Sequence, residues 1–435
     1  MLPPVGTCNM QTSAGTCKSK PHHHRAYLGF FLALSGALIA TSIVNLGDSG
    51  IPFFFATFFL VPLAVILPCS ASLHPRLSRN KFKIMLGISI VFLLMLIATF
   101  LRLLLNIQSG GSEILHFISR VSFLAYFSIC LYFLVGDTLT ACLIWLRRIL
   151  IVLALYGAYQ LPAKLLGLPL FLDWLRNNRS FAMYGYDTAG WVSLVRATSI
   201  FSEPSQAAVP LLVLIFLNKY IRAPRYSRLI GWIAIAGFTL LTFSRTVWLS
   251  ILALVLGRFI ARNAFFRNIF ETKRVAIATS LLCVALVMPL WAFYGANFNA
   301  DLSRQERAGS IIMGIQLIEA HPIIGSGWNS YQTLMPQYPI LVEGVSPDID
   351  FKIIHNMLIS YVEQSGIPGL VLALFPFMVL IFNSNSPLEL TLASLLAFLA
   401  VEEMGGDVGY SSLFWLWIAV LLNWNNNDSS IIINN

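Results

Sequence analysis

Long hydrophobic runs alternate with short polar segments along most of this 435-residue chain. About twelve of these runs have the roughly 17 to 25 residues that a helix needs to cross a hydrocarbon core. Backbone N–H and C=O groups in lipid need partners within the chain, and the continuous apolar runs lack the alternation of barrel strands. The pattern therefore predicts an all-α polytopic membrane protein. Its predicted transmembrane helices lie at residues 27–45, 51–68, 82–106, 114–135, 149–161, 206–220, 229–243, 246–260, 275–294, 357–382, 388–401 and 410–424.

Two long polar segments, residues 162–205 and 296–356, interrupt the hydrophobic pattern. In the first, the apolar face of residues 163–175 predicts a helix that lies in the membrane interface. In the second, residues 310–320 predict an amphipathic helix, which a glycine-containing turn follows. The predicted organisation is a tail at 1–26, a transmembrane domain at 27–424 that carries both polar segments as loops, and a tail at 425–435.

The placement of charge adds an orientation to this topology. With 57% hydrophobic and 11% charged residues, the chain has too little polar material to cover a soluble globule of its size. Its net charge of +9 could indicate a nucleic-acid partner, but the basic residues recur at every second loop, as expected of cytoplasmic loops. Both termini are then cytoplasmic, both long polar segments are periplasmic, and no nucleic acid is expected. The basic clusters are Lys18, Lys20, Arg25; Arg76, Arg79, Lys81, Lys83; Arg147, Arg148; Lys219, Arg222, Arg225, Arg228; and Arg258, Arg262, Arg267, Lys273, Arg274.

Several kinds of site are not indicated by the sequence. It contains no GxxxxGK[ST] phosphate-binding loop, no GxGxxG dinucleotide motif and no HExxH zinc motif. The six cysteines show no metal-ligand spacing, and in the loops only Asp348 and Asp350 form a close pair of carboxylates. We therefore predict neither an ATP-driven pump nor a metal enzyme, and no cofactor.

The candidate chemistry comes from arginines and one histidine. Arg304 and Arg307 stand near the start of the second polar segment, and His355 stands at its end. Arg245 lies at the external end of the hairpin formed by the helices at 229–243 and 246–260, where it could instead extend into lipid headgroups. Arginine's planar fork suits phosphate oxygens, and a neutral histidine can accept a proton. These residue types favour a phosphate-bearing substrate and general-base chemistry.

Four sequence elements in one order carry a resemblance to a known family. They are RATSIFSEPSQAA, LTFSRTVWLS, RAGSIIMGIQLIEAHPIIGSGWN and IIHNMLISYVEQSGIPGL. Together they resemble the O-antigen ligase and O-antigen polymerase superfamily of bacterial envelope enzymes. The resemblance extends over about residues 195–370, and the twelve-helix pattern agrees with it outside that region.

The resemblance implies a GT-C-like, metal-independent, inverting glycosyltransferase of the bacterial inner membrane. Such an enzyme takes glycan from undecaprenyl pyrophosphate at the periplasmic face, with a chain-length regulator and a flippase as candidate partners. In that role Arg245 and Arg307 would bind the pyrophosphate, and His355 would deprotonate the acceptor hydroxyl. Arg196 and Glu203 match the family less closely, and Glu203 is equally well explained as a cap at a helix start before Pro204.

Three interpretations remain open at this stage. The FSEPSQ element favours a polymerase, which joins lipid-linked repeat units, over a ligase, which transfers glycan to lipid A-core. A flippase is the competing class, but it would need polar residues along many helices, whereas the polar residues here collect on one face. Trp328 and Tyr331 could stack on sugar rings or anchor the chain at the interface. His321, before Pro322, is interpreted as structural.

Overall fold

The computed structural model describes most of the helical part of the chain. It covers residues 21–38, 42–46, 49–52, 79–104, 112–172, 197–201, 204–272, 302–328, 330, 334, 354, 356–384, 386–403 and 411–424. The helices are α1 (Pro21–Ala37), α3 (Arg79–Leu104), α4 (Ser112–Phe133), α5 (Asp137–Leu165), η3 (Pro204–Ala207), α6 (Ala208–Tyr220), α7 (Arg225–Thr242), α8 (Arg245–Arg262), α9 (Ala264–Thr272), α11 (Leu302–Ala320), α13 (Met357–Ser365), α14 (Ile367–Asn383), α15 (Leu388–Glu403) and α16 (Ser412–Asn423).

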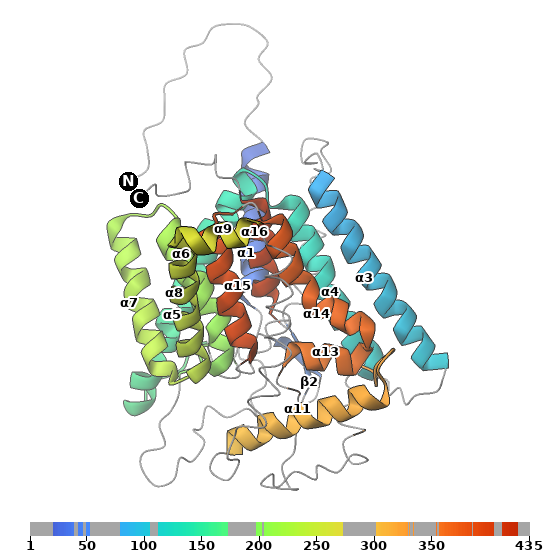
Figure 1. The fold of residues 1–435 in the computed structure, drawn as a ribbon. Helices are drawn as coiled ribbons and strands as arrows, with labels where there is room; N and C mark the ends of the chain where they lie inside the picture. The colour runs from blue at the N-terminus through green and yellow to red at the C-terminus, as the bar shows by residue number, and fades with distance from the viewer. Residues whose placement is uncertain are drawn as a thin grey trace, which may run out of the picture.

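The longer helices lie side by side in a bundle, with α16 in its interior (Figure 1). Every residue of α16 from Ser412 to Leu422 is buried, as expected of a helix that is apolar on all sides. Its aromatic residues contact rings from other helices: the Trp417 ring stacks on Phe216 of α6, and the Trp415 ring lies 5.5 Å from that of Phe127 in α4. Helix α16 therefore supplies the centre of the hydrophobic core.

The outer helices present apolar side chains to the surroundings. Helix α3 lies at one edge of the bundle (Figure 1), and large residues along it are exposed, including Phe82, Leu86, Ile90, Leu93, Ile97 and Phe100. Contiguous apolar surface of this extent is unusual on a soluble monomer. Two of the described helices, α3 and α5, are long and apolar enough to cross a membrane. These outward faces fit a membrane protein, whereas a count of twelve spans stays a prediction.

Much of the predicted helix pattern is confirmed as helix. Helices α3, α4, α6, α7, α8, α15 and α16 correspond to the predictions at 82–106, 114–135, 206–220, 229–243, 246–260, 388–401 and 410–424. The amphipathic helix predicted at 310–320 is also confirmed, and it begins earlier, at Leu302. The helix predicted at 275–294 lies outside the described residues. Helix α9, which was not predicted, follows α8 after one residue.

The first two predicted helices are wrong in part, because a β-hairpin takes their place. Helix α1 ends at Ala37, and strands β1 (Ser42–Leu46) and β2 (Ser49–Pro52) pair antiparallel, with Val44 opposite Ile51. The all-α prediction fails here for a local reason. The consecutive β-branched residues Ile43 and Val44 favour a strand, and a Gly-Asp pair, typical of tight hairpin turns, follows β1 in the sequence.

Helix α5 also differs from its prediction, since it begins at Asp137 instead of residue 149. The prediction placed Arg147 in a cytoplasmic loop, but this side chain is buried in α5. Its guanidinium donates to Asn218 Oδ1 from Nε (3.1 Å) and Nη2 (2.8 Å), and to Ser227 Oγ and the Ser227 carbonyl. A buried charge is tolerated where such partners satisfy its donors. Only the fold supplies them, from α6 and α7.

The interfacial helix predicted at 163–175 is not a separate element. Helix α5 continues to Leu165, and residues 166–172 then form turns, with Gly167 at a positive φ of 66°. Glycine adopts this left-handed conformation without the steric cost that other residues have, so the helix can end there. Residues 173–175 lie outside the described part of the chain.

The single helix predicted at 357–382 is two helices, α13 and α14, separated by Gly366. Gly366 has a φ of 63°, and a Cβ at this position would lie 2.2 Å from the Ile323 carbonyl oxygen. The break therefore combines a left-handed residue with close contact to a distant segment. At nine residues, α13 is too short to cross a hydrocarbon core.

Helices α9 and α11 mark opposite ends of the bundle, and both lie across it (Figure 1). If the basic loops are cytoplasmic, α9 lies at the cytoplasmic surface and α11 at the periplasmic one. We predict that an impermeant maleimide labels Glu319→Cys of α11 in intact spheroplasts of a cysteine-free strain. The same reagent should label Phe265→Cys of α9 only after permeabilisation. Both positions are exposed, so access to the reagent is not limited by burial. Labelling of position 265 in intact spheroplasts would contradict the topology.

Candidate functional site at the α11–α13 corner

Helices α11 and α13 form a close-packed corner. Ser310, Met313 and Leu317 of α11 are buried, as is Gly314 on the same face of the helix. A Cβ at position 314 would lie 2.6 Å from Ile359 Cγ2 and 3.1 Å from Ile354 Cδ1, so only glycine permits this approach of the two helices. The sequence G-x-x-L on an apolar face thus fixes how near α11 comes to α13.

Backbone hydrogen bonds join the turn that follows α11 to the C-terminal end of α13. Ser326 N donates to the Glu363 carbonyl (2.7 Å), and Gly327 N donates to the Gln364 carbonyl (3.2 Å). From the other side, Ile367 N donates to the Ile323 carbonyl (3.1 Å). These bonds satisfy carbonyl groups that a helix C-terminus leaves open. We call this arrangement the turn–helix lock; it consists of residues 323–327 and 363–367.

Gly325 is required for this lock. Its φ of 73° is left-handed, and a Cβ there would lie 2.3 Å from Ser365 N and 2.4 Å from the Gln364 carbonyl carbon. A side chain would therefore meet both an unfavourable backbone conformation and backbone atoms that cannot move aside. The Gly-Ser-Gly sequence, which predicts a turn, thus also permits the backbone to approach α13.

Helix α3 supports the lock from another side. Arg102 of α3 is fully buried and donates to the Ile324 carbonyl and to Thr99 Oγ1 (3.1 Å). Trp328 Nε1 donates to the same Thr99 hydroxyl (3.2 Å). Both interpretations of Trp328 from the sequence, sugar stacking and interfacial anchoring, are wrong, because its side chain is buried in the core. The sequence analysis also missed Arg102, whose signal was a charge inside an apolar run.

Glu363 is the buried acid of this corner. Its side chain is fully buried, and Oε1 accepts a hydrogen bond from Ser326 Oγ, which in turn accepts one from Ser330 Oγ (2.9 Å). Within the described residues, Glu363 Oε2 has no hydrogen-bond partner. Burial raises the pKa of Glu363 to about 8, although the Ser326 hydroxyl and the charge of Arg102 act in the opposite direction. Burial therefore favours the protonated form of the carboxyl.

The N-terminus of α13 places the candidate base. Asn356 is its N-cap, and its side-chain oxygen accepts from Ile359 N (3.0 Å). His355 itself lies outside the described residues, but its two neighbours, Ile354 and Asn356, are both buried. The chain on either side of His355 is therefore anchored beside α11.

Helical periodicity separates the two arginines of α11. Position 307 precedes Gly314 by seven residues, or two turns, so both lie on the face of α11 that contacts α13. Position 304 precedes Gly314 by ten residues, which at about 100° per residue places it well off that face. The backbone thus places position 307, and not position 304, on the side of α11 that contacts α13.

A second part of the candidate site is built on α5. Gln160 lies near the end of this helix and is fully buried. Its Oε1 accepts from Thr198 N (2.9 Å) and Ser199 N (2.7 Å), and its Nε2 donates to the Ser199 carbonyl (2.7 Å). Ser199 has a positive φ of 56°, and its hydroxyl donates to the Leu153 carbonyl (2.7 Å). The side chain of Gln160 therefore fixes the segment 197–201, which the sequence analysis did not anticipate.

The same segment is joined to the turn before α8. Ala197 N donates to the Leu241 carbonyl (2.9 Å), two residues before Phe243, whose φ of 45° ends α7. Arg245 is the first residue of α8, and its side chain is exposed. Because α8 reaches α9 at its C-terminus, Arg245 lies at the opposite end, toward the α11 side of the bundle (Figure 1).

The predicted site residues can now be placed. Arg245 is described with its side chain, whereas Arg307 is described by its position in α11 only. Arg196, Glu203, His355 and Tyr331 lie outside the described residues. Gln160 bonds Thr198 and Ser199, which follow Arg196 in the sequence, and Ile354 and Asn356 on either side of position 355 are buried. His321 ends α11 through backbone bonds to Leu317 and Gly325, in keeping with a structural role.

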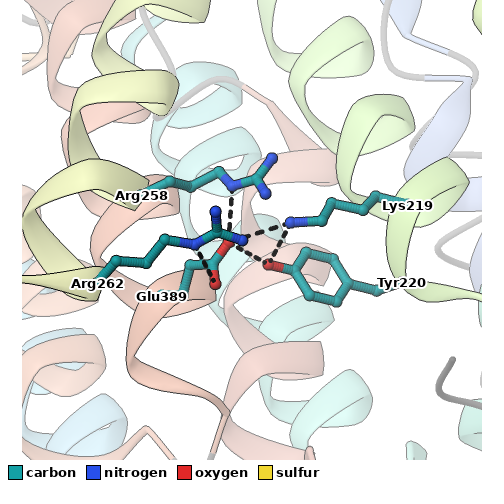
Figure 2. Close-up of polar contacts among 5 residues, drawn as sticks. All are labelled: Lys219, Tyr220, Arg258, Arg262 and Glu389. Carbon is teal, nitrogen blue, oxygen red and sulfur yellow. Dashed lines mark hydrogen bonds and ion pairs between the residues drawn. The ribbon is translucent and has the colours of Figure 1, made fainter. Parts of the chain in front are cut away.

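A separate charged cluster joins the other ends of three helices (Figure 2). Glu389 of α15 accepts from Lys219 Nζ (3.1 Å), Tyr220 Oη (3.1 Å), Arg258 Nε (2.7 Å) and Arg262 Nε (3.4 Å). Lys219 and Tyr220 end α6, the arginines lie near the end of α8, and Glu389 begins α15. This cluster is at the end of α8 that meets α9, away from Arg245. Its partners are satisfied by one another, and we interpret it as a structural tie.

Metal-ligand clusters were also sought among the described residues. That part of the chain holds no group of three or more His, Cys, Asp or Glu side chains placed to bind a metal ion. The prediction of a metal-independent reaction is not tested by this observation, and it stays a prediction.

Comparison of the sequence with known protein families gives a match over part of the chain. Residues 229–374 match the family described as O-antigen ligase. This match agrees with the superfamily that the four sequence motifs resemble. A search of curated proteins finds no match.

The family match covers the chain from α7 into α14. It therefore includes Arg245, α11 with Arg307, the turn–helix lock and the start of α13. The segment 197–201 and Gln160 lie before the matched residues. The match supports a function of the O-antigen ligase or polymerase type in general, and it does not separate polymerase from ligase.

We predict that Gln160→Leu destabilises the protein. The change leaves the backbone N–H groups of Thr198 and Ser199 and the Ser199 carbonyl buried without their partner, and each such group costs about 1–3 kcal/mol. The midpoint of thermal unfolding in detergent should fall by several degrees. Tyr159→Phe is the matched control, since its hydroxyl bonds an exposed Pro169 carbonyl. Equal midpoints for the two variants would contradict the role of Gln160.

Proposed function

We propose that the protein is an envelope-polysaccharide polymerase that joins oligosaccharide repeat units carried on undecaprenyl pyrophosphate at the periplasmic face. One observation supports this proposal above the others: the fold brings the Arg307 face of α11, the start of α13 beside His355, and the Arg245 end of α8 to one side of the bundle (Figure 1). These three elements are distant in sequence. Their residue types suit a lipid pyrophosphate and a hydroxyl acceptor.

In the proposed reaction, the acceptor sugar's hydroxyl oxygen attacks the anomeric carbon of the donor. The bond from that carbon to the pyrophosphate oxygen breaks, and undecaprenyl pyrophosphate leaves with the electron pair. His355 takes the hydroxyl proton, and Arg245 and Arg307 neutralise the charge that develops on the pyrophosphate. Attack opposite the leaving group inverts the anomeric centre.

Arg196 and Glu203 would act at the margin of this site. They flank the segment 197–201, which Gln160 fixes to α5 and which bonds to Leu241 just before Arg245. We propose that Arg196 adds a third contact to the pyrophosphate, and that Glu203 supports the site or caps the helix that begins at Pro204. A chain-length regulator and a flippase are the proposed protein partners, and the inner membrane is the proposed location.

Deletion of the gene tests polymerase against ligase. Loss of a polymerase should leave lipid A-core that carries a single repeat unit or a short oligosaccharide. Loss of a ligase should leave core without glycan and polymer on its lipid carrier, and loss of a flippase should trap single repeats on the cytoplasmic side. Gel analysis of the envelope polysaccharide separates these outcomes, and the second or third pattern would overturn the polymerase proposal.

Substitution of the arginines tests their part in pyrophosphate binding. Lysine keeps the charge but not the fork that makes two parallel hydrogen bonds, so Arg307→Lys and Arg245→Lys should lose most activity at normal expression. Arg304→Lys is the matched control, because position 304 is off the face that contacts α13. Polymer formation in the complemented deletion strain is the measurement. Full activity in Arg307→Lys would identify that residue as a surface cation.

Substitution of His355 tests the general base. Base catalysis contributes typically about 10²- to 10⁴-fold, so His355→Ala should lose turnover of that order while donor affinity, which depends on the arginines, is retained. His321→Ala is the control, since His321 ends α11 through its backbone. Turnover and donor affinity are measured separately with purified enzyme and synthetic lipid-linked donor. Normal turnover in His355→Ala, or joint loss of turnover and binding, would reject the assignment.

A further inference from the structure

Glu363 is a buried acid to which the proposed reaction assigns no role. It is fully buried at the C-terminal end of α13, and one of its oxygens lacks a hydrogen-bond partner among the described residues. A buried carboxyl is costly unless its bonds have a structural or functional use. The hydrogen bonds that Glu363 makes to the turn after α11 indicate that use.

Glu363 holds this turn with both its backbone and its side chain. Its carbonyl accepts from Ser326 N (2.7 Å) and from Ser326 Oγ (3.1 Å), and its Oε1 accepts from the same hydroxyl. Ser330 Oγ donates to Ser326 Oγ (2.9 Å), which extends the chain of hydroxyls along the turn. The carboxyl therefore fixes the one residue of the turn that lies between the two left-handed glycines, Gly325 and Gly327.

This turn also determines the position of α11. It follows the last residues of α11 directly, and Gly325 N bonds back to the His321 carbonyl (3.0 Å). Helix α11 contacts α13 at its middle, through Gly314, and at its end, through the turn. Two such contacts define the angle of a helix, whereas one leaves it free to pivot. The second contact thus governs where the first turns of α11, with position 307, lie relative to the start of α13.

We infer that Glu363 is a positioning residue, which holds the Arg307-bearing helix in register with the His355-bearing start of α13 through Ser326. This inference rests on the proposed function for its catalytic consequence. Its geometric part, that Glu363 sets the position of α11, does not depend on the reaction. Because a misplacement of about 1 Å can reduce turnover by about 10²-fold, a small pivot of α11 is sufficient for a large effect.

Three substitutions at position 363 separate the effect of side-chain length from the effect of charge. Glu363→Gln keeps an oxygen acceptor at the same distance from Ser326 and is neutral, so it should keep kcat within about threefold. Glu363→Asp keeps the acid but shortens it by one methylene, and Glu363→Ala removes the acceptor; both should lower kcat by about 10- to 100-fold. The KM for the donor should rise as well, because a pivot of α11 also moves Arg307, one of the proposed donor contacts.

The matched control is Gln364→Ala. Gln364 is also buried in α13, but among the described residues its side chain bonds only Ser360 of the same helix (2.7 Å), and the backbone carbonyl that contacts the turn is retained. A general loss of stability from an altered α13 would therefore appear in this variant too. If Glu363→Ala fails to fold, Ser326→Ala, which removes the hydroxyl that donates to the carboxyl and accepts from Ser330 Oγ, replaces it in every measurement.

The geometric part is measured by electron–electron double resonance between spin labels at Glu319 of α11 and Met378 of α14, in a cysteine-free background. The distance distribution should shift or broaden in Glu363→Ala and Glu363→Asp, and stay as in the parent in Glu363→Gln and Gln364→Ala. An unchanged distribution in Glu363→Ala, or equal changes in Gln364→Ala, overturns the inference. If His355→Ala remains active while the distributions change as expected, the proposed reaction fails and the positioning role stands.

Discussion

Three backbone hydrogen bonds between the turn after α11 and the end of α13 determine the arrangement of the candidate site. Ser326 and Gly327 donate to carbonyls at the end of α13, and Ile367 at the start of α14 donates back to Ile323. The exchange is possible because Gly325 and Gly366 bring two stretches of bare backbone together. It breaks what would be one long helix, and it holds α11 across the end of the bundle (Figure 1).

Around this lock, three charged side chains of the described residues form hydrogen bonds with distant parts of the chain. Arg102 bonds the turn, Arg147 bonds α6 and α7, and Glu389 gathers cations from α6 and α8 (Figure 2). In an apolar setting each of these groups would be costly without its partners. The charged side chains therefore act as ties between helices that hydrophobic packing alone would orient less specifically.

The candidate site draws on two supports that are independent of each other. Gln160 fixes the segment that leads from Arg196 to Glu203, and the turn–helix lock fixes the segments that carry Arg307 and His355. The O-antigen ligase family match begins after the first support and includes the second. Rigid backbone on both sides of a substrate is what a reaction between two lipid-linked glycans requires, since the acceptor and the leaving pyrophosphate must be held in line.

The sequence by itself determined the class of the protein and most of its helices. Long apolar runs specify helices because no other structure satisfies the backbone in lipid, and the order of four motifs indicated the superfamily that the comparison confirmed. It also singled out Arg245 and Arg307 as candidate site residues, because they match the motifs of that superfamily. The hairpin at 42–52 was missed because strand and helix compete closely in a short apolar run.

Only the tertiary structure decided which polar residues are structural. Trp328 seemed a sugar-binding or interfacial residue, yet it is buried against Thr99, and Asn356 caps α13 beside His355. Gln160 and Glu363 gave no distinct signal, and the charge of Arg102 in an apolar run did not reveal its role, because their partners lie 38, 37 and 222 residues away. Periodicity reports which face of a helix is apolar, but it carries no information on which distant backbone groups that face will meet. Long-range hydrogen bonds of this kind arise only when the chain has folded.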